Sequence, residues 1–89
     1  NCDEVAYRAI RQLRGMGYNV PEDISIVGYD NYLISEVSDP TITTINVDAD
    51  YMADLAVMTL MDRMEEPDGK PRIITIEGDL VIKDSVKRI

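Results

Sequence analysis

The beginning of the chain combines a helical pattern, a short loop and an apolar run, in that order. Apolar side chains recur at three- and four-residue spacing over residues 3–16, which predicts an amphipathic helix that Gly15 and Gly17 end. A loop with a proline follows at residues 19–23. Residues 24–29 then show little alternation of apolar and polar side chains, which predicts a short strand buried on both faces. A helix followed by such a strand favours a parallel α/β sheet.

The middle of the chain predicts a loop, an extended segment and a second helix. Residues 30–40 predict a loop with one helical turn at residues 33–37, and the β-branched residues 41–47 predict a strand or extended crossover. Acidic residues at 48–50 suit the cap of a helix over residues 51–64. That helix is apolar over much of its circumference, so we expect it to be covered on more than one side. We interpret its methionines as residues that fill a core rather than as the lining of a promiscuous binding groove.

The end of the chain predicts a solvated turn at residues 65–71 and two short strands, at residues 72–77 and 80–83. Two helices and about four strands make a poor self-contained domain, because a parallel sheet needs helices on both faces. The chain also opens within a helical pattern, without an initiator Met or signal segment. We therefore expect it to be part of a larger domain.

Composition excludes several functions for this segment. Nine basic and seventeen acidic residues give a formal net charge of −8, whereas nucleic-acid affinity depends mostly on basic side chains. The chain has no histidine and a single cysteine, so we predict no metal site, no cofactor and no catalytic residue. Its apolar stretches are too short to span a membrane, and the lone cysteine fits a cytoplasmic protein.

Five segments, in order, resemble the LacI/GalR family of transcriptional regulators. Residues 20–31 (VPEDISIVGYDN) are similar to the family's "VPEDISVVGFDD" almost residue for residue. The remaining four are residues 3–13 with "NDxxAxGAxxAL", residues 39–45 with "xPxLTTV", residues 52–60 with "MGxxAVxxL" and residues 80–86 with "LVVRxSV". The resemblance covers essentially the whole chain.

The resemblance implies a periplasmic-binding-protein-like fold of type I, a three-layer αβα arrangement with parallel sheets, of which this chain holds the C-terminal portion. Residues 1 to about 40 would belong to the C-terminal subdomain. Residues from about 41 to 79 would form a crossover and a part of the N-terminal subdomain, and residues from about 80 to 89 a return strand. The family's helix-turn-helix headpiece would lie upstream, outside this chain.

Asp30 is the foremost candidate for effector binding, because it directly follows the predicted strand, where ligands of open α/β sheets bind. The matching aspartate of the family contacts the effector, and a carboxylate can accept bonds from two sugar hydroxyls. A turn aspartate that closes the loop is the alternative. Cys2 stands where the family has an effector-facing Asn, so Asn1 substitutes or polar contact is reduced there. Asp3 is a further candidate for effector binding, although we favour a capping role for it at the first helix. Asn1 is the other candidate for that cap.

A dimer interface is predicted on the first helix, at Val5 and Arg8, and in the loop after Asp30, at Tyr32, Leu33 and Ile34. The family packs these regions against a second subunit, and Arg8 stands where the family commonly has Gly. A solvated helix face for Arg8 and core packing for the loop residues are the alternatives.

These expectations favour the effector-sensing part of a repressor, in which a small sugar-like effector binds between two subdomains of a homodimer and controls DNA binding. The alternative is a soluble sugar-binding protein of a transport system with the same fold. An enzyme is a third class, disfavoured because no Ser-His or Cys-His pair and no Gly-rich phosphate loop is present.

Overall fold

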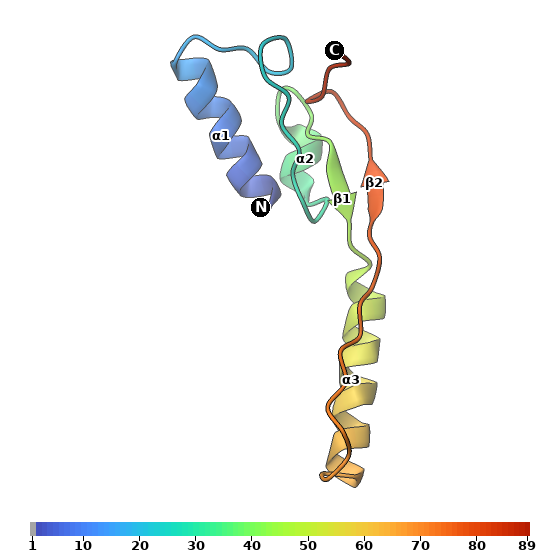
Figure 1. Cartoon of the computed structure of the whole chain (residues 1–89). Coiled ribbons are helices and arrows are strands. Elements are labelled where there is room, and N and C mark those ends of the chain that lie inside the picture. Colours follow the sequence, from blue (N-terminus) through green and yellow to red (C-terminus); the bar gives the residue numbers. More distant parts are fainter. Residues whose placement is uncertain (1) are drawn as a thin grey trace. The chain divides into compact units, whose positions relative to one another are not determined.

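The computed structural model describes residues 2–89. It contains, in order, α1 (Asp3–Gly15), α2 (Leu33–Val37), β1 (Thr44–Asn46), α3 (Ala49–Glu65) and β2 (Asp79–Val81) (Figure 1). These elements fall into two compact units: Asn1–Val47 with Asp79–Ile89, and Asp48–Gly78. Within residues 2–89, no helix is long and apolar enough to cross a bilayer.

Helix α1 confirms the predicted amphipathic pattern. Its buried apolar face, Ala6 and Ile10, packs with Val20 and Ile42 to form the small core of the first unit, and Tyr7, Leu13 and Ile26 border that core. The helix ends at Gly15, one residue before the predicted end, and the backbone reverses at Gly17, whose φ of +91° is a conformation that glycine adopts without strain.

The predicted cap of α1 is wrong. Cys2, not Asp3, is the N-cap residue, and its side chain makes no capping hydrogen bond. Asp3 is the first residue inside the helix, and its carboxylate accepts hydrogen bonds from Tyr32 and Thr44 instead of from its own helix. Asn1, the other predicted cap, lies outside the described residues.

Residues 24–29 are extended but do not form the predicted doubly buried strand. The segment pairs with residues 43–46 through two isolated parallel bridges, Val27 with Thr43 and Asp30 with Asn46. The side chains of Ile24, Val27 and Tyr29 are exposed. Burial on both faces needs neighbouring layers, and the described residues supply only part of them. The parallel direction of this pairing agrees with the prediction.

Helix α2 lies at the predicted helical turn, and β1 lies within the predicted extended segment. β1 pairs antiparallel with β2, with Thr44 opposite Val81 and Asn46 opposite Asp79. β2 thus confirms a strand here, although it begins one residue and ends two residues before the predicted strand at residues 80–83. The strand predicted at residues 72–77 is wrong: Ile74 and Ile76 line a hollow with Met52, Leu55 and Ala56 of α3, so this segment packs on a helix rather than on another strand.

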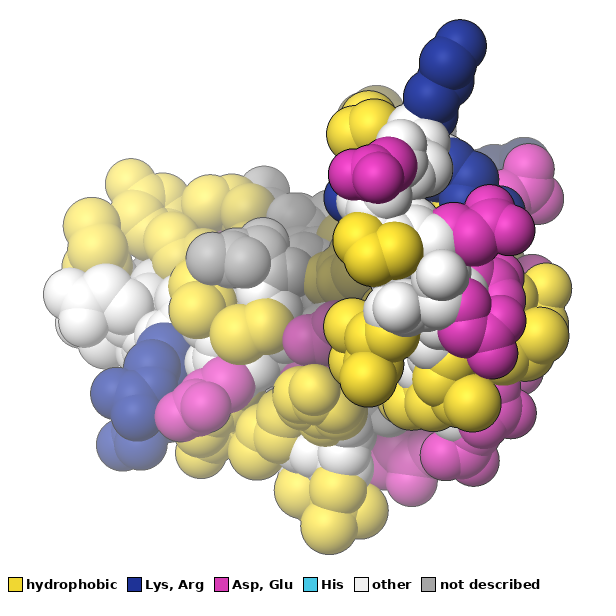
Figure 2. Space-filling view, turned by 90° about the horizontal axis from the view of Figure 1, so that it is seen from below, with side chains coloured by type: hydrophobic (Ala, Val, Ile, Leu, Met, Phe, Trp, Pro, Cys, Tyr) yellow, Lys and Arg dark blue, Asp and Glu magenta, His cyan; other side chains and the backbone are white. Residues whose placement is uncertain are grey.

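Helix α3 begins two residues before its predicted start, and Asp48 caps it by accepting a 3.0 Å hydrogen bond from the backbone N–H of Tyr51. The predicted cover of α3 is not found among residues 2–89, because none of the helix residues is buried. Its four methionines are exposed, so they fill no core here. Apolar side chains, drawn in yellow, lie open at the surface in Figure 2.

Candidate functional site

Asp30 lies where the extended segment 24–29 ends, and the backbone there is left-handed. The φ angles are +106° at Asp30 and +59° at Asn31. Such angles are uncommon outside glycine, and Asn and Asp are the residues that tolerate them best. They cluster at binding and catalytic sites, where surrounding contacts hold them.

Three consecutive backbone N–H groups hold this turn. Asp30 donates to the carbonyl of Ile45 at 2.9 Å, and Asn31 donates to the hydroxyl of Thr44 at 3.2 Å. Tyr32 donates to Asp3 Oδ2 at 2.7 Å. The turn is thus fixed through its backbone by α1 and by the segment that contains β1.

Asp30 is half-buried, and its carboxylate takes part in none of the hydrogen bonds or ion pairs found among residues 2–89. An ionised carboxylate can accept several charge-assisted hydrogen bonds. Asp30 therefore has the free acceptor capacity that a ligand rich in hydroxyl groups requires.

A network of polar side chains lies next to the turn and consists of Asn31, Ser35, Asn46 and Lys83. The Asn31 side chain accepts a hydrogen bond from Lys83 Nζ at 3.0 Å and donates to Asn46 Oδ1 at 3.2 Å. The Ser35 hydroxyl donates its single proton to the carbonyl of Tyr32 at 2.7 Å. Lys83 Nζ also donates to Ser35 Oγ at 2.7 Å. The network joins the residue next to Asp30 to α2, to β1 and to the segment after β2.

The sequence pattern did not single out Thr44, Asn46, Ser35 or Lys83 as residues of the site. Thr44 lies in a β-branched run that is typical of a strand. Nothing in that pattern indicates that its hydroxyl accepts a hydrogen bond from a backbone N–H of a distant loop. Lys83 lies in the segment similar to "LVVRxSV", where the family's Arg was a signal that this position carries a cation.

Asp3, a predicted effector residue, is fully buried behind the turn. It lies against Gly28, where an added Cβ would collide with Asp3 Oδ1 and come within 3.2 Å of Ile42 Cγ2. Cys2 is a half-buried free thiol at the start of α1. Asn1 is outside the described residues. Among residues 2–89, no cluster of three or more potential metal ligands occurs.

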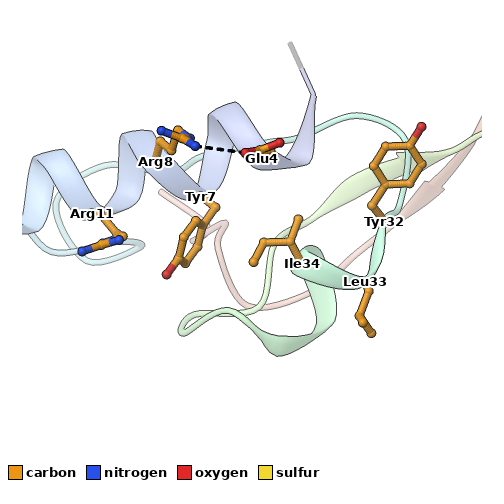
Figure 3. Close-up of a pocket in the computed structure, with 7 residues that line it drawn as sticks. All are labelled: Glu4, Tyr7, Arg8, Arg11, Tyr32, Leu33 and Ile34. Atoms are coloured by element: carbon orange, nitrogen blue, oxygen red, sulfur yellow. Dashed lines mark hydrogen bonds and ion pairs between the residues drawn. The ribbon is translucent and has the colours of Figure 1, made fainter.

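Four of the five residues predicted for the dimer interface lie around a hollow of about 460 Å³ between α1 and α2, shown in Figure 3. Arg8, Tyr32, Leu33 and Ile34 all line it, and Val5 on α1 is exposed without lining it. Its other lining residues are Glu4, Tyr7 and Arg11. Tyr32 and Leu33 are 63% and 71% exposed, so within this chain they are not core residues.

Arg8 forms an exposed ion pair with Glu4, one helical turn away, at 3.1 Å. Pairs of this kind contribute little to stability. Arg11 lies over the ring of Tyr7 with its guanidinium carbon 5.9 Å from the ring centre. The hollow therefore combines two charged side chains, Arg8 and Arg11, with the apolar side chains of α2. Such a combination occurs at protein–protein interfaces as well as on solvated surfaces.

A sequence model of the periplasmic binding protein-like domain family matches residues 1–86. The HTH-type transcriptional repressor PurR of Mannheimia succiniciproducens is 38% identical over 89 residues, which are 99% of this chain and 27% of that repressor. The chain thus spans about a quarter of the length of the curated relatives it matches.

Solved structures give the same result for the fold. A complex of the transcriptional regulator CelR with cellobiose superposes with a TM-score of 0.84 at 31% identity, over 94% of this chain and 26% of that one. The Lac repressor dimer bound to operator and the anti-inducer ONPF superposes with a TM-score of 0.81 at 27% identity, over 96% of this chain and 29% of that one. The predicted periplasmic-binding-protein-like fold is confirmed.

Proposed function

Because the chain belongs to the periplasmic binding protein-like domain family, as part of the effector-binding domain of a LacI/GalR-type regulator, we propose that it forms one wall of an effector site centred on Asp30. The observation that carries the proposal is the half-buried Asp30, whose carboxylate no described residue engages although its backbone is firmly held. The relatives named above are regulators, and the role proposed for this chain is binding without catalysis.

A sugar or sugar derivative is the proposed effector. Neighbouring hydroxyls on a pyranose or furanose ring can donate to the two oxygens of one carboxylate. The CelR structure that superposes on this chain holds cellobiose, which supports this ligand class. Cys2, the N-cap residue of α1, is proposed to contribute to the same wall, with the weak hydrogen-bonding capacity of its thiol reducing polar contact there. Asn1, which lies outside the described residues, is the proposed substitute for that contact.

The test is a thermal-shift screen of the intact regulator against glucose, ribose, cellobiose, sugar phosphates and purines. A ligand that binds only the folded state raises Tm, by an amount that follows its concentration relative to Kd. We expect at least one sugar to raise Tm and Asp30→Ala to abolish that increase. Asp39→Ala, which removes an exposed carboxylate elsewhere in the first unit, is the matched control. A full ligand-induced increase in the Asp30→Ala variant would refute the site assignment.

We further propose that the hollow between α1 and α2 is part of a homodimer interface through which effector binding controls DNA binding by a headpiece outside this chain. The exposure of Tyr32 and Leu33 supports this, since exposed apolar and aromatic side chains are typical of interface anchors. The Lac repressor structure to which this chain is similar is a dimer on its operator.

Sedimentation velocity on the intact regulator tests the interface. Leu33→Asp buries an unpaired charge in the proposed interface and is expected to shift the protein to monomer. Met16→Asp, at an exposed position outside the hollow, is the control and is expected to leave the dimer intact. An unchanged dimer in the Leu33→Asp variant would contradict the assignment.

A transport-type sugar-binding protein is the competing proposal, with the same role for Asp30. Both proposals assign the chain a ligand site, and they differ in the segment that would lie upstream in the intact protein. A regulator would have a helix-turn-helix there, and a transport protein would have a secretion signal. We expect the regulator to be cytoplasmic.

A further inference from the structure

Asp3 is a fully buried carboxylate whose two oxygens are both engaged. Oδ2 accepts the backbone N–H of Tyr32 at 2.7 Å, and Oδ1 accepts the hydroxyl of Thr44 at 2.6 Å. Buried charges in proteins are rare unless they are fully hydrogen-bonded, so this residue has a defined structural task.

Asp3 brackets the turn that carries Asp30. Its own backbone N–H donates to the carbonyl of Tyr29 at 3.0 Å, on the near side of the turn, and its carboxylate accepts from Tyr32, on the far side. Asp30 and Asn31, the two residues with left-handed backbone, lie between these two bonds.

Thr44 connects the carboxylate of Asp3 to the backbone of Asn31 through two hydrogen bonds. The Thr44 hydroxyl donates its proton to Asp3 Oδ1 and can therefore present only its lone pairs to the backbone N–H of Asn31, from which it accepts at 3.2 Å. The backbone N–H of Tyr32 donates to Asp3 directly, and the backbone N–H of Asn31 donates to the Thr44 oxygen whose proton is given to Asp3. The N–H groups of Asn31 and Tyr32 thus depend on one carboxylate.

Gly28 leaves the space that Asp3 occupies. A Cβ at this position would collide with Asp3 Oδ1, so the absence of a side chain lets the carboxylate reach the turn from behind the extended segment. Gly28 therefore faces Asp3.

We propose that Asp3 is the positioning residue of the effector site: it holds the left-handed Asp30–Asn31 turn so that the Asp30 carboxylate is presented without a partner among residues 2–89. The proposal rests on the proposed role of Asp30. Asp3 is fully buried, so direct contact with the effector would require the turn to open, whereas positioning requires no rearrangement.

Amide hydrogen exchange of the intact regulator without any ligand, resolved to single residues by NMR, tests the positioning directly. Asp3→Asn keeps the shape but replaces one acceptor oxygen with a donor. We expect at least tenfold faster exchange at Asn31 and Tyr32 relative to core amides of α1 such as Ile10. Glu4→Gln, which neutralises the neighbouring exposed carboxylate, is the control and should leave both rates unchanged.

Thr44→Val keeps the test decisive if Asp3→Asn does not fold. Valine lacks the hydroxyl that accepts from Asn31, so we expect faster exchange at Asn31 while Tyr32, bonded directly to Asp3, stays protected. A merely structural role for Asp3 would change all amides of the unit together. Unchanged exchange at Tyr32 in a folded Asp3→Asn variant, or equal acceleration at both amides in Thr44→Val, would overturn the proposal.

Ligand binding supplies the second measurement, with whichever of glucose, ribose and cellobiose raises the Tm of the unmodified regulator. We expect Asp3→Asn to reduce that increase at least by half although Asp30 is intact. Loss of the increase in Asp30→Ala but not in Asp3→Asn would overturn the positioning role and leave the effector site standing. Loss of the increase in Asp3→Asn but not in Asp30→Ala would overturn the effector role of Asp30. The amide exchange data would still report how the turn is held.

Discussion

At the residue scale, two aspartates near the same turn have opposite environments. Asp3 is fully buried with both oxygens bonded, and Asp30 is half-buried with its carboxylate unengaged by the described residues. The difference arises because Asp3 begins a helix that packs behind the turn, whereas Asp30 stands on the turn itself. A buried, saturated carboxylate organises structure, and an unsaturated one can bind a ligand.

Gly28→Ala should be strongly destabilising, because the new Cβ collides with Asp3 Oδ1 and crowds Ile42. We expect the free energy of unfolding to fall by about 3 kcal/mol, as is typical of overpacking combined with disturbed buried hydrogen bonds. Urea denaturation of the intact regulator measures this.

Gly15→Ala is the matched control for that substitution. Gly15 lies in the last turn of α1 with open space around it, so alanine should leave stability unchanged or raise it by about 0.5 kcal/mol through its better helix propensity. A Gly28→Ala variant as stable as Gly15→Ala would show that Asp3 does not occupy the space next to Gly28.

At the element scale, the first unit is joined by segments that are far apart in the sequence. Ser85 is fully buried, donates its hydroxyl to the carbonyl of Ile26 and accepts the N–H of Thr43 at 2.8 Å. The backbone N–H of Ile26 also donates to the Ser85 carbonyl at 3.0 Å. One serine near the end of the chain thus links the extended segment 24–29 to the segment that leads into β1.

Ser85→Ala should reduce the free energy of unfolding by about 1–3 kcal/mol, since it leaves the Thr43 N–H and the Ile26 carbonyl buried with a lost partner. Ser25→Ala is the control: Ser25 is exposed, and water can replace it as the acceptor for the Lys87 N–H. Equal stability of the two variants, measured by urea denaturation, would argue against this link.

The N-cap of α3 gives a second prediction at this scale. Asp48→Ala removes the acceptor for the Tyr51 N–H and should destabilise the first turn of α3 by about 1 kcal/mol. Amide exchange at Tyr51 should rise several-fold, whereas Asp54→Ala, an exposed change within the same helix, should leave it unchanged. Identical exchange at Tyr51 in both variants would show that the cap is not formed in solution.

At the scale of the whole molecule, the second unit exposes far more apolar surface than a stable domain does. Helix α3 has no buried residue, and Met58, Leu60, Met61 and Met64 are all more than half exposed. Contiguous exposed apolar surface marks a face that needs a partner. Within the second unit, the segment that follows α3 packs on it.

The 89-residue chain by itself should therefore unfold over a broad temperature range and bind the dye ANS, because marginal stability depends on apolar burial that this chain does not achieve. Calorimetry and dye fluorescence measure this, with the intact regulator as the control that melts sharply and binds little dye. A sharp cooperative melt of the isolated chain would contradict the expectation.

The sequence by itself determined local structure where local physics decides it. The periodicity of α1, the turn at α2, the β-branched run around β1 and the Asp48 cap were all confirmed, because side-chain spacing, φ preference and capping act within a few residues. The ordered motifs also identified the family, and Asp30 was selected as the ligand candidate because of its place after an extended segment.

Only the tertiary structure decided how each of these residues is used. The pattern of residues 24–29 predicted burial, but burial depends on neighbouring layers. Asp3 was favoured as a cap, yet it accepts from residues that follow it by 29 and 41 positions. Thr44, Asn46, Ser35 and Lys83 gave no sign of a common network, because a hydrogen bond between distant segments leaves no periodic trace in the sequence.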